Sequence, residues 1–82
     1  MKLRPNLTTR EIRGEFVVVD TKSGNYHIFN EVGGFIWRGL ENGSGSKTIV
    51  QGLVSAYKVT PDEALADFRT FVTNLQSYGL LE

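Results

Sequence analysis

The spacing of apolar residues changes near the middle of the chain, from a strand-like pattern to a helix-like one. Residues 15–20 are β-branched and apolar on both faces, which predicts a central strand. Residues 21–24 are typical of a glycine-containing turn, so residues 25–29 are expected to return antiparallel to that strand. Residues 7–13 mix Thr, Ile and charged side chains, which favours a half-exposed edge strand, and a short basic lead, residues 1–6, precedes them.

Helical spacing begins after Asn30. The Asn30 side chain is placed to accept a hydrogen bond from a first-turn amide, so we expect a helix that ends near residues 41–43. Within it, Gly33 and Gly34 each cost up to roughly 1 kcal/mol of helix stability relative to alanine. A glycine pair in this position predicts a close neighbour packed against the backbone.

Two further helices are expected. Ser46 is expected to cap the second helix, which ends near residues 58–59. The third has the clearest start, because Thr60 and Glu63 form a capping-box pattern with Pro61 in the first helical position, and Gly79 is expected to end it. The apolar positions recur at three- and four-residue spacing and define the expected buried faces: Val32, Phe35, Ile36 and Leu40, then Ile49, Val50, Leu53, Val54 and Tyr57, then Ala64, Leu65, Phe68, Phe71, Val72 and Leu75.

The composition of the chain argues against several classes of function. At 82 residues, of which 40% are apolar, the chain is expected to be a single domain, residues 1–82. Nine basic and nine acidic side chains cancel, so no overall field favours nucleic acid or an anionic membrane as a partner. The absence of cysteine excludes disulfides, thiolate metal sites and thiol catalysis. No segment reads as a signal peptide or a membrane span, so we expect a cytoplasmic location.

The sequence offers no group of residues suited to catalysis. Its one histidine, His27, has no neighbouring ligand set, so strand pairing is favoured over a metal role. Ser and Thr residues fall at caps and turns, where backbone hydrogen bonding accounts for them. We therefore expect no catalytic residue, no metal and no cofactor, and interpret the chain as a binding protein.

Two features predict a site for an extended peptide. If residues 15–20 are central, the strand 25–29 has one free edge, whose amides and carbonyls can pair with an added strand. On the third helix, about 100° per residue places a second set of side chains along one margin of the buried face. The predicted peptide-binding residues are Asn25, Tyr26, His27, Ile28 and Phe29 on the strand, and Asp67, Phe71, Asn74 and Tyr78 on the helix.

Each helix residue has an expected role in binding. Phe71 and Tyr78 are expected to hold an apolar side chain of the peptide, Asn74 to bond its backbone, and Asp67 to pair with a basic residue. The alternatives are structural: Phe71 also falls within the apolar stripe, Asp67 also suits plain solvated surface, and Tyr78 also suits a cover over the C-terminal leucine pair. For Trp37 we favour a core position.

Several short patterns, in the same order along the chain, resemble the PqqD-like family of peptide-recognition domains. The resemblance runs from Glu15 to the C-terminus. It departs from the usual pattern at Phe29, where leucine is common, and at the Gly33-Gly34 pair. The matching positions are Tyr26-x-x-Phe29-Asn30, Ile36-Trp37, Ile49 with Leu53, Tyr57-x-Val59, and Asp67-x-x-x-Phe71-x-x-x-Leu75-x-x-x-Gly79-Leu80-Leu81.

The resemblance implies an α+β, winged-helix-like fold, in which a three-stranded antiparallel sheet is followed by three α-helices. It also implies that the partner is the leader segment of a ribosomally made precursor peptide, held as an added strand between the third strand and the third helix. Stand-alone members of the family of this length resemble the leader-binding proteins of lasso-peptide pathways. They present the leader to processing enzymes such as a leader peptidase and a cyclase.

Two other functions use a similar layout. A winged-helix protein that binds DNA would place the start of its third helix near phosphates, but here that end carries Asp62, Glu63 and Asp67 against a single Arg69. These carboxylates would repel a duplex. A scaffold subunit that docks an enzyme, or that dimerises, would use the same free strand edge without any peptide partner.

Overall fold

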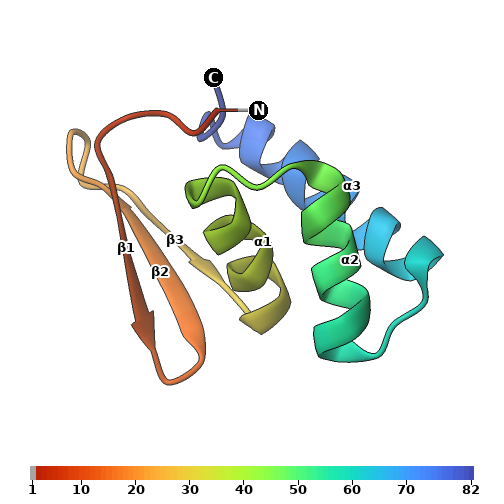
Figure 1. Cartoon of the computed structure of the whole chain (residues 1–82). Helices are drawn as coiled ribbons and strands as arrows, with labels where there is room; N and C mark the ends of the chain where they lie inside the picture. The colour runs from red at the N-terminus through yellow and green to blue at the C-terminus, as the bar shows by residue number, and fades with distance from the viewer. Residues whose placement is uncertain (1) are drawn as a thin grey trace.

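A computed structural model describes residues 2–82 as a small antiparallel sheet followed by a set of helices (Figure 1). Met1, part of the basic lead expected at residues 1–6, lies outside the described residues. The α+β fold with three strands followed by three helices, expected from the sequence, is confirmed for residues 2–82. The strands are β1 (Leu7–Ile12), β2 (Glu15–Asp20) and β3 (Tyr26–Phe29), and the helices are α1 (Glu31–Glu41), α2 (Ser46–Tyr57) and α3 (Pro61–Ser77).

The sheet has the order β1-β2-β3, with both pairs antiparallel. Strand β2 is therefore central, as its apolar sequence predicted. Tight turns connect the strands, and residues with positive φ close both of them: Arg13 and Gly14 in the first, and Gly24 in the second. The expected strand 25–29 begins one residue later than predicted, and the expected strand 7–13 ends one residue earlier.

The helices cover one face of the sheet, and the other face is open (Figure 1). Alternation along β2 buries Phe16 and Val18 on the covered face and leaves Val17 and Val19 half-buried on the other. Although β2 is apolar on both faces, only one face packs against helices.

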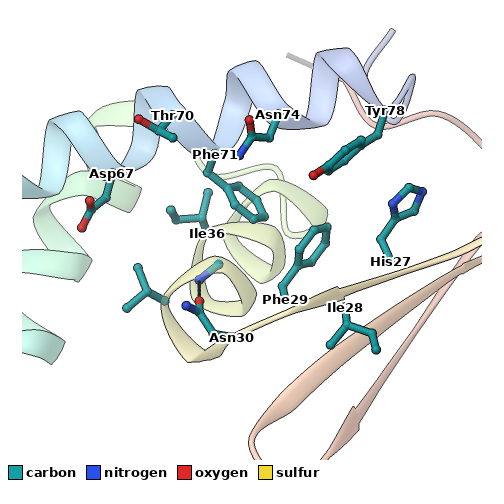
Figure 2. A pocket seen from close by; sticks show the side chains of 12 residues that line it. His27, Ile28, Phe29, Asn30, Ile36, Asp67, Thr70, Phe71, Asn74 and Tyr78 are labelled. Carbon is teal, nitrogen blue, oxygen red and sulfur yellow. Dashed lines mark hydrogen bonds between the residues drawn. The ribbon is translucent and has the colours of Figure 1, made fainter.

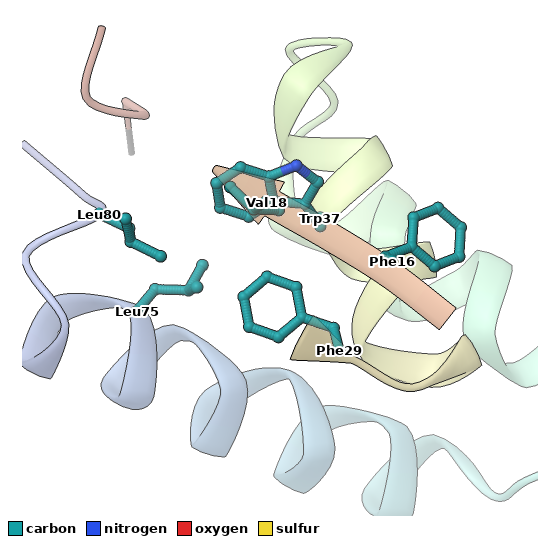
Figure 3. Close-up of a cluster of buried hydrophobic side chains, with 6 residues drawn as sticks. All are labelled: Phe16, Val18, Phe29, Trp37, Leu75 and Leu80. Atoms are coloured by element: carbon teal, nitrogen blue, oxygen red, sulfur yellow. The ribbon is translucent and has the colours of Figure 1, made fainter. Parts of the chain in front are cut away.

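The core consists of two clusters of buried side chains. The first joins the sheet to α1 and to the C-terminal end of the chain, and it contains Phe16, Val18, Phe29, Trp37, Leu75 and Leu80 (Figure 3). The second lies among the helices and contains Ile36, Ile49, Leu53, Ala64 and Phe68. Phe71 is half-buried and packs against both clusters. Trp37 is fully buried, which confirms its predicted core position, and its Nε1–H donates to Thr9 Oγ1 at 2.8 Å.

The glycine pair in α1 has the close neighbours that its sequence predicted. A Cβ atom on Gly34 would overlap the ring of Phe16, so only glycine allows β2 and α1 to pack at this distance. The ring of Phe71 occupies the equivalent space beside Gly33.

Helix starts follow the predicted caps in two cases out of three. Asn30 Oδ1 accepts the Gly33 N–H at 2.9 Å, and the capping box between Thr60 and Glu63 is complete on both sides. The prediction that Ser46 caps α2 is wrong. Gly45 holds the extended cap position, and Ser46 is the first helical residue.

One predicted core residue of α3 lies at the surface. Leu65 was expected on the buried face, but 37% of it is exposed. Its angular position lies at the margin of the apolar stripe, and the buried positions of α3 are Ala64, Phe68 and Leu75.

The two ends of the described chain are held together. Arg4 N–H donates to the Leu80 carbonyl at 2.9 Å, and Leu3 forms an antiparallel bridge with Leu81. Leu80 is fully buried, so the C-terminal end of the chain folds back on the core. Over residues 2–82, no helix is both long enough and apolar enough to span a membrane.

Candidate functional site

An open groove of about 530 Å³ runs between β3 and α3, with the start of α1 as its floor (Figure 2). One wall comes from β3 and the opposite wall from α3. The lining residues are His27, Ile28 and Phe29 from β3, Asn30 at the cap of α1, Val32, Gly33 and Ile36 from α1, and Asp67, Thr70, Phe71, Asn74 and Tyr78 at α3.

The wall formed by β3 is an edge strand. Because the sheet order is β1-β2-β3, the far side of β3 has no neighbouring strand within residues 2–82. Had Tyr26–Phe29 been enclosed by strands on both sides, an added strand would have had no place to pair. The sequence-based expectation of one free edge is therefore met.

The direction of the free backbone groups follows from the register. Asp20 N–H donates to the Asn25 carbonyl at 2.8 Å, so the backbone of Asn25 points toward β2. Orientation alternates along an antiparallel strand. In the observed register, the N–H and C=O groups of Tyr26 and Ile28 therefore point away from β2, toward the open edge.

Aromatic rings line one end and the middle of the groove. The rings of His27 and Tyr78 are stacked, with centroids 4.9 Å apart, and they lie at one end of the groove (Figure 2). Phe29 and Phe71 meet edge to face in the middle, with centroids 4.8 Å apart. These two contacts join β3 to α3 and hold the two walls at a fixed separation.

Polar groups lie on the α3 wall. Asp67 is at the end of the groove opposite Tyr78, with Thr70 and Asn74 between them (Figure 2). All three are exposed. The arrangement presents a carboxylate, a hydroxyl and an amide to anything that occupies the groove, next to the apolar surfaces of Phe71 and Ile36.

The structure brings seven of the nine predicted site residues together. His27, Ile28 and Phe29 line the groove from one side, and the α3 set predicted from helical spacing lines it from the other: Asp67, Phe71, Asn74 and Tyr78. Asn25 and Tyr26 are not among the lining residues. Asn25 precedes β3, and Tyr26 directs its side chain to the open face of the sheet, where 64% of it is exposed.

The sequence reasoning missed the floor of the groove. Asn30 was predicted only as a helix cap, and Val32, Gly33 and Ile36 only as parts of a core helix. Thr70 was also missed, although it lies three residues after Asp67 and four before Asn74, a spacing that puts it on the same margin of α3. Over residues 2–82, no group of three or more His, Cys, Asp or Glu side chains is placed to hold a metal ion.

Comparison with known proteins identifies the family of the chain. The model of the family described as coenzyme PQQ synthesis protein D (PqqD) matches residues 15–81. The chain belongs to this family, as its sequence patterns indicated. No curated protein matches it.

Two solved structures share the fold over nearly the whole chain. TbiB1 in complex with the TbiA(beta) leader peptide is 30% identical, with a TM-score of 0.90, and the match covers 100% of this chain and 95% of that one. Lasso peptide synthetase B1 complexed with the leader peptide is 28% identical, with a TM-score of 0.87, and the match covers 99% of this chain and 95% of that one.

Proposed function

We propose that the protein binds the leader segment of a ribosomally made precursor peptide and delivers it to processing enzymes, including a leader peptidase. The leader adds to the free edge of β3 as an extra strand and lies in the groove beside α3. Two similar solved structures hold leader peptides, which supports this choice of partner. The protein acts by binding rather than catalysis and works in the cytoplasm.

The observation that carries the proposal is the alignment of a free strand edge with a lined groove. Tyr26 and Ile28 present their backbone N–H and C=O groups along the same edge that borders the groove. A peptide strand that pairs with these groups directs every second side chain toward α3. Pairing supplies register, and the groove supplies selectivity.

Approximate free energies show why binding needs both backbone pairing and burial of apolar side chains. Ordering one peptide residue costs about 1–2 kcal/mol of backbone entropy, and one net hydrogen bond returns about 0.5–1.5 kcal/mol. Backbone pairing alone therefore gives almost no net affinity. Burial of two or three large apolar side chains, each contributing about 1.5–3 kcal/mol, brings the complex to micromolar affinity or better. Phe71, which is half-buried and lines the groove, offers apolar surface for that burial.

The side chains that line the groove give each of its parts a different role in binding. Asp67 pairs with a basic side chain at one end of the groove, and Asn74 bonds the peptide backbone in the middle. At the other end, Tyr78 and His27 form an aromatic surface for a second apolar side chain.

Fluorescence polarisation tests the proposal. The probe is a labelled peptide that covers the N-terminal segment of the precursor encoded beside this gene, and its scrambled version is the control. We expect saturable binding of the authentic segment alone, with little change between low and moderate salt. Binding of duplex DNA would instead weaken steeply with salt. Absence of leader binding up to high micromolar concentration would reject the proposal.

A further inference from the structure

The floor of the groove contains a glycine whose missing side chain decides how deep the groove is. Gly33 lies in the first turn of α1, is buried, and lines the groove. A Cβ atom at this position would lie 2.9 Å from Cε1 of Phe71 and 3.2 Å from Cβ of Phe29. The ring of Phe71 therefore rests directly on the backbone of α1.

Phe71 has little freedom to move elsewhere. Its ring meets Phe29 edge to face, and its side chain packs against both core clusters. With α1 below it and Phe29 beside it, a methyl group on Gly33 would displace the ring upward, into the groove. The same ring lines the groove, so its height sets the space left for a side chain above it.

We propose that Gly33 is a specificity-determining residue. Because it has no side chain, the Phe71 ring lies against the backbone of α1, and this leaves room in the groove for one bulky apolar side chain of the bound strand. This inference rests on the proposed use of the groove for an added strand. It specifies the peptide class further: an extended segment with an aromatic or large branched residue at the position that faces Phe71. We call the space in the groove above the Phe71 ring the socket. A peptide with a small side chain at this position leaves the socket unfilled and binds more weakly.

The molecule contains a matched control. A Cβ atom at Gly52 of α2 would lie 2.8 Å from Cζ of Phe35, almost the same conflict between a helix glycine and a phenylalanine ring. Neither Gly52 nor Phe35 lines the groove. Gly52→Ala therefore introduces a comparable steric conflict between a helix residue and a phenylalanine ring without changing the groove.

A displayed library of random twelve-residue peptides tests the inference without any leader sequence. Selection on the wild type and on Gly52→Ala should enrich large apolar residues at one fixed position. Selection on Gly33→Ala should enrich smaller residues there, and a peptide selected on the wild type should bind Gly33→Ala at least about tenfold more weakly. Its version with alanine at the fixed position should bind the two proteins within about twofold.

A second, compensating substitution distinguishes a steric effect on the socket from a general loss of structure. In the double variant Gly33→Ala with Phe71→Leu, the shorter side chain accommodates the new methyl group, and enrichment of large residues should return. If Gly33→Ala does not fold, the single variant Phe71→Leu tests the inference. Its shorter side chain deepens the socket, so it should select larger residues than the wild type selects. An unchanged selection profile in Gly33→Ala, or in Phe71→Leu when Gly33→Ala does not fold, overturns the inference.

The library also keeps this inference distinct from the proposed function. If the wild type selects large apolar residues but does not bind the precursor leader, the proposed partner is wrong and the socket stands. If it binds the leader but selects no large apolar residue from the library, the socket is wrong and the proposed function stands.

Discussion

At the scale of single residues, the side chains that line the groove differ in how far they also belong to the core. Tyr78 and Asp67 are exposed, whereas Phe71 is half-buried and contacts both core clusters. The alternative that Phe71 serves the core is therefore correct in part, because its ring both packs in the interior and lines the groove.

Alanine variants of Phe71 and Asp67 should both weaken leader binding. Loss of the Phe71 ring removes about 1.5–3 kcal/mol of apolar contact, or roughly 10- to 100-fold in affinity. Loss of the exposed Asp67 carboxylate should cost only about two- to fivefold, because surface ion pairs are weak. Fluorescence polarisation with the labelled leader measures both effects.

Leu65→Ala is the control for these variants, since Leu65 lies on α3 away from the groove and should leave affinity unchanged. Thermal melting of each variant reports whether the fold is retained. If Phe71→Ala and Asp67→Ala retain both fold and affinity, the binding site lies elsewhere.

Asp20 should make stability depend on pH. Its buried carboxylate accepts the N–H of Lys22 at 2.9 Å, which is the main cause that lowers its pKa, and it also accepts the N–H of Ser23 and pairs with Arg4. A lowered pKa means that the unfolded chain binds the proton more readily. This contribution to the free energy of unfolding is present above about pH 4 and lost as the pH falls through the pKa of the folded state.

Urea denaturation between pH 2.5 and 6 checks this expectation. Asp20→Asn should show a smaller fall in unfolding free energy over that range than the wild type. Equal pH dependence in wild type and Asp20→Asn would show that this carboxylate is not linked to stability.

At the scale of elements, sequence patterns predicted the parts of the fold whose causes are local. Asn30, Thr60 and Glu63 marked helix starts because the bonds that they make span only three residues. Ser46 misled because Gly45 precedes it, and either residue suits the cap position.

The groove was predictable on two walls and not on its floor. The free edge of β3 and the margin of α3 follow from strand order and helical spacing, which a sequence carries. The glycine pair indicated that some side chain packs closely on α1, but that Gly33 and Ile36 form the floor depends on how α1 lies between β3 and α3, and the spacing of residues in α1 does not carry that tertiary arrangement.

Proline at Ile28 should separate strand addition from simple side-chain docking. The Ile28 N–H points to the open edge, so Ile28→Pro removes a donor to the added strand without removing a bond between β2 and β3. We expect a loss of up to about tenfold in leader affinity, measured by fluorescence polarisation, because one hydrogen bond contributes about 0.5–1.5 kcal/mol.

Ile28→Ala is the control, since it keeps the amide that borders the groove while it shortens a side chain that points, like that of Tyr26, to the open face of the sheet, away from α3. It should bind almost as well as the wild type. If the two variants lose affinity equally while their circular dichroism is unchanged, the side chain matters and the backbone pairing does not.

At the scale of the whole molecule, the helix-covered face of the sheet and its free edge have different roles. The helices cover one face of the sheet (Figure 1), and the groove lies at the edge of the sheet, between β3 and α3. The zero net charge, together with Asp62, Glu63 and Asp67 near the start of α3, favours a peptide over a nucleic acid. A scaffold role at the same edge would show as self-association or enzyme docking that the leader does not affect.

Amide hydrogen exchange with and without leader tests the central claim most directly. The amides of Tyr26 and Ile28 face the open edge of β3, and those of Thr9 and Glu11 face the opposite open edge, on β1. On saturation with leader, we expect exchange at Tyr26 and Ile28 to slow markedly while exchange at Thr9 and Glu11 stays unchanged. Bound leader that leaves Tyr26 and Ile28 exchanging as before, or that protects the β1 edge instead, would contradict strand addition at β3.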